Sequence, residues 1–197
     1  MSKKKVAVFV DWENVRKGVF EEAGRRLHRE ISYNSTENVL RFIKSFINPE
    51  EEEIYRIFVY LTEPFTGTIG GVDYTTMPAF THSMNFIDRL QVEELVAVRK
   101  GKIAYRGQDR DNRPIFIQKQ VDMILGLDVA HVAHHRLADR ALILTLDTDC
   151  VPAMKAARIS GMQVMLAFCP DIQHEISKEL RKHADFVRRK DFGTIFA

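Results

Sequence analysis

The chain has 197 residues, of which 45% are hydrophobic and 28% charged, a composition typical of one globular domain spanning residues 1–197. No apolar run is long enough to cross a membrane, the start Met1-Ser-Lys-Lys-Lys lacks the apolar segment of a signal peptide, and two cysteines are too few for a disulfide framework. We therefore expect a soluble cytoplasmic protein, and its net charge of +2 excludes binding to nucleic acid by bulk charge alone.

The first half of the chain is predicted to alternate between buried strands and amphipathic helices, because its apolar residues recur at the spacing of each. In chain order these are a strand at residues 5–10, helices at 15–27 and 36–47, a strand at 54–61 and a helix at 79–91. The stretch 62–78 contains two prolines and three glycines and is predicted to be a loop. A loop of this length in a compact domain is usually functional or mobile.

The second half continues the alternation. In chain order it is predicted to contain a strand pair at 92–105 that turns near Lys100-Gly101, a polar loop at 106–113, an extended piece at 114–117, a helix at 119–135, a strand at 141–146, a helix at 151–160 that stops at Gly161, a strand at 163–168, a helix at 171–184 and a strand at 185–188. The helix at 119–135 is apolar nearly all round, so we expect it to be deeply packed. Together these elements predict an α/β fold with a mostly parallel sheet and helices on both faces.

Two of the predicted strands end in acids: Asp11 follows the strand at 5–10, and Asp147 and Asp149 follow the strand at 141–146. If these strands are parallel neighbours, their acids meet at the edge where open α/β sheets hold ligands. Each acid also has a simpler interpretation. Asp11 would be a turn residue before a helix capped by Asn14, and Asp149 or Cys150 would cap the helix at 151–160. For Asp147 no such structural role is evident.

Asp122 and Asp128 interrupt the apolar helix at 119–135. They lie about 120° apart around the helix axis, so they cannot both face one site. We favour Asp122 for the site, and Asp128 for a supporting or salt-bridge role. Acids gathered in one pocket repel one another strongly enough to require protonation or a cation. An all-carboxylate site suits Mg²⁺ or Mn²⁺, and no Cys/His set with zinc spacing competes. His131, His134 and His135 lie at i, i+3 and i+4, but near a helix C-terminus, where cationic histidine is merely favourable.

The acid-bearing blocks carry a resemblance to a known family. Val-Phe-Val-Asp11-Trp-Glu-Asn14, Lys119-x-Val-Asp122 with Asp128 beyond it, and Leu-Thr-Leu-Asp147-Thr-Asp149 together resemble the NYN domain family, the LabA-like members of the PIN-like nuclease superfamily, over about residues 5–170. The resemblance implies a Rossmann-like α/β/α sandwich and a metal-dependent ribonuclease. It implies that Asp11, Asp122, Asp147 and Asp149 bind the metal, that Asn14 orients the first acid or contacts substrate, and that Lys119 faces phosphate.

The activity that we expect is hydrolysis of phosphodiester bonds in single-stranded RNA, assisted by Mg²⁺ or Mn²⁺. Besides Lys119, the arginines of the polar loop, Arg106, Arg110 and Arg113, would hold substrate; alternatively they form a solvated surface. The aromatic residues Trp12, Phe65 and Tyr74 would stack unpaired bases, or else pack within the protein. A flexible single strand of RNA fits such a site better than a duplex, because the acids would lie in a crevice. Homo-oligomers are possible but not indicated.

Two residues depart from the pattern of the family, in which a small Ser/Thr-Gly pair commonly precedes the D-x-D acids and an aromatic residue often follows them. This chain has Thr145-Leu146 and Cys150 instead. Leu146 could narrow access to a metal, which favours a second hypothesis, a catalytically silent module that binds RNA or protein. A third hypothesis is a haloacid-dehalogenase-type phosphatase, which Asp147-Thr-Asp149 resembles, although only 48 residues follow the motif.

Overall fold

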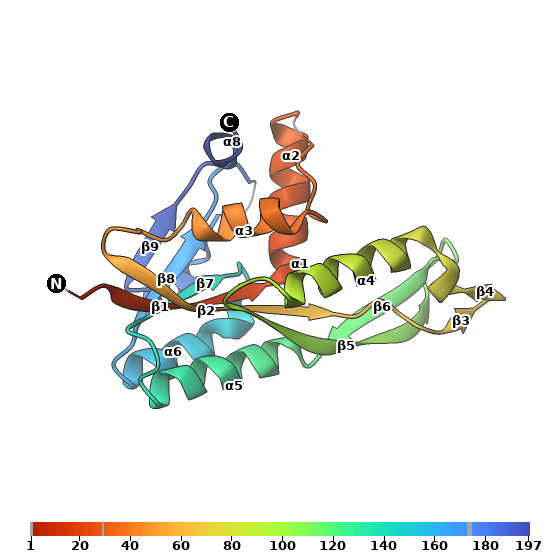
Figure 1. Ribbon diagram of the computed structural model, residues 1–197. Helices are drawn as coiled ribbons and strands as arrows, with labels where there is room; N and C mark the ends of the chain where they lie inside the picture. Colours follow the sequence, from red (N-terminus) through yellow and green to blue (C-terminus); the bar gives the residue numbers. More distant parts are fainter. Residues whose placement is uncertain (1, 29, 173–174) are drawn as a thin grey trace.

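A twisted, mostly parallel sheet forms the centre of the protein (Figure 1). The structure is a computed structural model and describes residues 2–28, 30–172 and 175–197. The seven strands lie in the order β6-β5-β2-β1-β7-β8-β9, and every neighbouring pair is parallel except β5 and β6. The strands are β1 (Lys4–Asp11), β2 (Glu52–Thr62), β5 (Val96–Gln108), β6 (Pro114–Lys119), β7 (Arg140–Leu144), β8 (Gln163–Phe168) and β9 (Phe186–Arg189). The predicted α/β class is confirmed.

Helices cover both faces of this sheet (Figure 1). On one face lie α5 (Val121–His134), α6 (Val151–Ile159) and α7 (Lys178–His183), and on the other lie α1 (Trp12–Val15), α2 (Glu22–Arg26), α3 (Thr36–Lys44), α4 (Pro78–Gln91) and α8 (Phe192–Ile195). A π-helical segment, Arg16–Glu21, joins α1 to α2 without a break. The predicted loop at 62–78 contains a small ribbon, β3 (Thr68–Ile69) and β4 (Val72–Asp73), and the 3-10 turn Tyr74–Thr76.

Strand β1 occupies the middle of the sheet, where it pairs with β2 on one side and β7 on the other. Its apolar residues from Val6 to Val10 are fully buried because helices cover both faces. The register places Val6 beside Arg140 and Val10 beside Leu144. The prediction that the strands at 5–10 and 141–146 are parallel neighbours is therefore confirmed. The residues that follow β1 and β7 consequently meet at one edge of the sheet.

The predicted strand pair at 92–105 is wrong, since β5 runs without a turn through Lys100-Gly101. It pairs first with β2 and further along with β6. Gly101 is buried in the middle of the strand, where a Cβ atom would lie 2.6 Å from Cγ2 of Val121 and 2.7 Å from the carbonyl oxygen of Lys119. The glycine therefore permits a close approach of β6 and α5 rather than a turn.

Gly101→Ala should lower the free energy of unfolding by about 1–3 kcal/mol, because the added methyl group overpacks the start of α5. A matched change within α5, Gly126→Ala, should have the opposite effect. Its Cβ would meet only Cβ of Ala153, at 4.0 Å, and alanine favours a helix over glycine by about 1 kcal/mol. Urea unfolding of both variants checks the pair, and equal stabilities of Gly101→Ala and the unchanged protein would contradict the packing argument.

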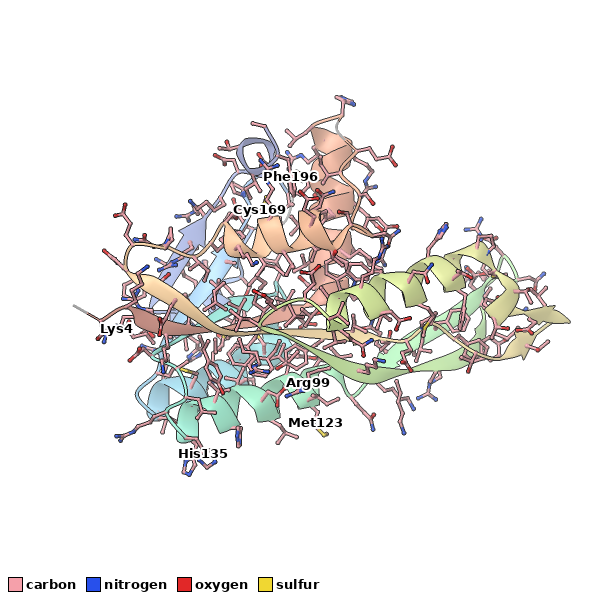
Figure 2. The ribbon with its side chains drawn as sticks, viewed as in Figure 1. Lys4, Arg99, Met123, His135, Cys169 and Phe196 are labelled. Atoms are coloured by element: carbon pink, nitrogen blue, oxygen red, sulfur yellow. The ribbon has the colours of Figure 1, made fainter. Side chains whose placement is uncertain are left out.

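Two helices differ from their predictions. Helix α5 is buried on one side only: Met123 and Leu127 are 69% and 65% exposed, and Figure 2 shows Met123 on the side of α5 away from the sheet. The expectation that the whole helix is deeply packed is therefore wrong. Helix α7 is shorter than the predicted 171–184, of which residues 173–174 lie outside the described chain. Gly161 ends α6 as predicted, with a φ of 86°. Within the ranges described, no helix is both long and apolar enough to span a membrane.

Candidate active site at the carboxyl edge of the sheet

Asp11 ends β1 and is among the few buried charged residues, with 8% of its surface exposed. Its Oδ1 atom accepts a hydrogen bond from the backbone N–H of Asn14 at 3.3 Å, and its Oδ2 atom accepts one from the Thr145 hydroxyl at 3.0 Å. Asp11 itself therefore caps α1. The alternative in which Asn14 caps this helix is not what the structure shows.

The side chain of Asn14 joins the segments that follow β1 and β7. Its Oδ1 atom accepts a hydrogen bond from the backbone N–H of Leu146 at 2.9 Å. Nearby, the backbone N–H of Asp147 donates to the Thr145 hydroxyl oxygen at 3.1 Å. These bonds hold Asp11 and Asp147 on one rigid frame. The role of Thr145 was not predicted; its signal in the sequence is a hydroxyl at the end of an otherwise apolar strand.

Asp147 has the structural role that sequence reasoning assigned to Asp149. Its Oδ1 atom accepts from the backbone N–H of Asp149 at 2.9 Å and so caps the 3-10 turn Thr148–Cys150. Cys150 stands at the N-cap position of α6 but makes no side-chain cap, and Asp149 is exposed. The prediction that Asp147 has no such role is thus wrong. The cap engages one carboxylate oxygen and leaves Oδ2 without a hydrogen bond to any described residue.

One open pocket of about 580 Å³ brings together acids from three distant parts of the chain. Its lining includes Asp11, Asn14, Lys17, Gln118, Asp122, Leu146 and Asp147. We call it the acidic pocket. Asp122 lies in the first turn of α5, as predicted, and the chain enters that helix through Gln120, whose φ of 74° is left-handed. Lys17 and Gln118 are pocket residues that sequence reasoning did not identify.

The other predicted site residues are exposed and do not line the acidic pocket. They are Asp149, Lys119, Arg106, Arg110 and Arg113. Lys119 pairs with Lys102 across the β5–β6 hairpin. The three arginines lie near the turn of that hairpin, which projects from the body of the protein (Figure 1).

Asp128 lies away from the acidic pocket and has the salt-bridge role that its helix angle predicts. Its Oδ2 atom accepts hydrogen bonds from the Tyr60 hydroxyl at 3.0 Å and from Nε of Arg99 at 2.8 Å. Arg99, labelled in Figure 2, comes from β5 and Tyr60 from β2. The carboxylate therefore ties α5 to two strands and supports the helix that carries Asp122.

The acidic pocket disfavours the ionised forms of its own acids. Burial raises the pKa of Asp11 to about 6; hydrogen bonds from Asn14 and Thr145 oppose this, and the charges of Asp122 and Asp147 add to it. The pKa of Asp122 is also raised, first by burial and then by the charges of Asp147 and Asp149. Lys17 offsets little of this negative charge, because its ammonium group is paired with Glu13 at 2.6 Å. A cation in the pocket would relieve the repulsion.

The residues fit a hydrated hard cation better than a fully protein-bound one. In the described part of the chain, no set of three or more His, Cys, Asp or Glu side chains is placed to hold a metal ion directly. The acidic pocket nevertheless offers carboxylate oxygens and room for water. Mg²⁺ usually keeps several waters and binds through one or two carboxylates, so this donor set suits it and the similar Mn²⁺.

The raised pKa of Asp11 predicts how metal-free stability depends on pH. Between about pH 4 and pH 6 the folded state binds a proton that the unfolded state has lost, so the contribution of Asp11 to stability falls as pH rises. The loss is complete above pH 6 and amounts to at most about 3 kcal/mol. Asp11→Asn should remove it. Urea unfolding at several pH values in EDTA should show the variant gaining relative to the unchanged protein between pH 4 and pH 6, and a constant difference would contradict the assignment.

The strand order, with acids at the carboxyl edge of a mostly parallel sheet, defines an α/β protein of the PIN-like class. A family model described as the NYN domain matches residues 5–188, so the chain belongs to the NYN domain family, which is part of the PIN-like superfamily. Members of this family are generally nucleases.

One solved structure with this fold is that of a protein of unknown function from Vibrio parahaemolyticus, with a TM-score of 0.55. The two sequences are 18% identical, and the match covers 96% of this chain and 94% of the other. A likeness at this identity shows the fold alone. No match was found among curated proteins.

Proposed function

We propose that the protein is a metal-dependent ribonuclease that hydrolyses single-stranded RNA at the acidic pocket. The observation that carries the proposal is the meeting of Asp11, Asp122 and Asp147, from three distant segments, in one open pocket. NYN nucleases act on RNA and PIN-like nucleases typically use divalent metals, which supports the same conclusion.

In this proposal Asp11, Asp122 and Asp147 would hold a hydrated Mg²⁺ or Mn²⁺ ion, in part through its waters, and the ion would supply a water of lowered pKa and neutralise charge on the phosphate. Asn14 and Thr145 position Asp11 by hydrogen bonds. We retain Asp149 in the proposed metal-binding set, since its charge acts on Asp122. Cys150 has no nucleophilic role, because burial raises the pKa of its thiol to about 12.

The proposed substrate contacts lie along the β5–β6 hairpin and the start of α5. Lys119 is exposed and stands three residues before Asp122 in the chain. We propose that it binds a phosphate adjacent to the pocket, and that Arg106, Arg110 and Arg113 bind more distant phosphates. Such contacts are independent of sequence and weaken with salt.

A catalytically silent RNA-binding or protein-binding module is the second candidate, and Leu146 is the observation that favours it. Its side chain lines the acidic pocket, and its backbone N–H is already bound to Asn14. That N–H is consequently not free to bind a substrate. The phosphatase hypothesis gains no support from the family to which the chain belongs.

The test is cleavage of an end-labelled single-stranded RNA, compared with the same sequence as a duplex, in Mg²⁺, in Mn²⁺ and in EDTA. We expect slow cleavage of the single strand that needs the metal. Lys119→Ala should weaken binding and flatten its salt dependence, whereas Lys44→Ala, a change to an exposed lysine at the end of α3, should do neither. RNA that binds but stays intact in both metals would overturn the nuclease and favour the silent module.

A further inference from the structure

A second cavity, of about 320 Å³, opens beside the acidic pocket. Glu13 and Gln118 line both cavities, so the two are adjacent. Trp12 and Phe86 form part of its wall, with their rings stacked at a centroid distance of 5.1 Å and an angle of 26°. Trp12 directly follows Asp11 in the chain. A ligand in this second cavity would therefore lie next to any group held by the acids.

The charges around the second cavity are already paired. Nε and a terminal nitrogen of the Arg16 guanidinium donate to the two carboxylate oxygens of Glu13, at 3.0 and 2.7 Å, and its other terminal nitrogen is bound by Glu21. The guanidinium plane also lies over the ring of Tyr33, 5.4 Å from its centroid. Because carboxylates occupy the donors of Arg16, its guanidinium group is not free to bind a phosphate in this cavity. A flat, uncharged group is the better match.

Several polar side chains of the second cavity lack protein partners. The side chains of Asn34, His82 and Ser83 line it and make no hydrogen bond to another described residue. Gln118 uses its amide N–H on the Thr62 hydroxyl, at 3.3 Å, which leaves its carbonyl oxygen available. These groups can donate to and accept from the edge of a heterocyclic ring. Unstacked RNA bases are recognised in this way, by aromatic or guanidinium surfaces and by hydrogen bonds to their edges.

We propose that the second cavity binds the nucleobase of the RNA nucleotide next to the scissile phosphate. The proposal deepens the nuclease assignment and rests on it for the identity of the ligand. The shared lining residues Glu13 and Gln118 place this cavity next to the acids. The paired charges disfavour a phosphate in it, and the unpaired polar groups supply contacts to the edge of a base. Hydrogen bonds to the edge of the base would contribute to binding and to the register of the cut.

Trp12 is the single tryptophan of the chain and reports directly on this cavity. Ribonucleoside 5′-monophosphates, added in EDTA so that cleavage plays no part, should produce a saturable change in its fluorescence. Ribose 5-phosphate, which has the same sugar and phosphate but no base, should produce none. An equal response to ribose 5-phosphate would show a phosphate site and overturn the proposal.

Ser83→Phe should fill the second cavity and weaken nucleotide binding by about tenfold or more, a factor that corresponds to about 1.4 kcal/mol. Thr81→Phe adds the same ring to an exposed position of α4 that does not line the cavity and should leave binding unchanged. Asn34→Ala opens the cavity instead of filling it and should also weaken binding, which covers the case in which Ser83→Phe does not fold. Unaltered binding in both cavity variants would overturn the proposal.

The result also separates this proposal from the nuclease assignment. RNA cleavage without a base-dependent response of Trp12 would overturn the base site and leave the nuclease in place. A base-dependent response without cleavage in Mg²⁺ or Mn²⁺ would support the base site and overturn the nuclease.

Discussion

Asp11→Asn and Asp147→Asn should each lower metal-dependent RNA cleavage by at least about 100-fold, a loss reached in other proteins even when only a neighbour of a metal ligand is changed. Each substitution removes one negative charge from the acidic pocket while keeping the shape of the side chain. Fewer charges weaken the binding of the ion, and a site that holds less ion also holds less activated water. Metal binding and activity should therefore fall in parallel.

The fold should survive both substitutions, because an asparagine oxygen can still accept the backbone hydrogen bonds that Asp11 and Asp147 accept from Asn14 and Asp149. Melting temperatures with and without Mn²⁺ separate the two effects. The unchanged protein should gain stability from the ion, and the variants should gain little. Asp128→Asn is the matched control, since its carboxylate binds Tyr60 and Arg99 instead of lining the pocket, and it should reduce cleavage far less.

Asp149→Asn distinguishes a ligand from a neighbouring charge. Asp149 is exposed and lies outside the lining of the acidic pocket. If Asp149→Asn lowered RNA cleavage as much as Asp147→Asn, the side chain of Asp149 would have to move to bind the ion. Cleavage that persists in both Asp11→Asn and Asp147→Asn would place the activity elsewhere and remove the support for the nuclease.

The central part of the site could be predicted because its signal is local. Runs of branched apolar residues identify β1 and β7, and an acid directly after each run identifies the carboxyl edge of the sheet. The details that depend on backbone geometry could not. Strand β7 ends at Leu144, two residues before its predicted end, and this places the Thr145 hydroxyl against Asp11 and makes Asp147 the cap of a turn.

Close approaches between distant segments also leave no local signal. Gly101 has the sequence context of a turn, and only the position of Val121 shows that the residue is small because α5 packs against it. The second cavity has the same origin. Its lining comes from α1, β2, α4, β6 and the segment between α2 and α3, and the polar residues Asn34 and Ser83 look like ordinary surface residues until their neighbours are known.

Glu52→Gln should lower the free energy of unfolding by about 3–5 kcal/mol, a large part of the roughly 5–15 kcal/mol that stabilises a typical domain. The side chain of Glu52 is fully buried and accepts hydrogen bonds at 2.6 Å from the guanidinium groups of Arg140 and Arg188. It also accepts one from the backbone N–H of Asn48 at 2.9 Å. The neutral amide would leave two largely buried guanidinium groups without a counter-charge.

Urea unfolding of Glu52→Gln beside Glu53→Gln tests this, because Glu53 is the exposed neighbour on the same strand. Burial of Glu52 raises its pKa, but the hydrogen bonds from Arg188, Asn48 and Arg140 outweigh burial and hold the pKa below the ordinary value of 4.5. Its stabilising contribution is therefore complete above about pH 4.5 and is lost as the pH falls through the lowered pKa. The two proteins should converge in acid. Glu52 lies at the start of β2 beside Lys4, at the opposite end of the strands from the acidic pocket. Metal-dependent cleavage by the folded Glu52→Gln variant, measured at low temperature, should therefore be unaffected.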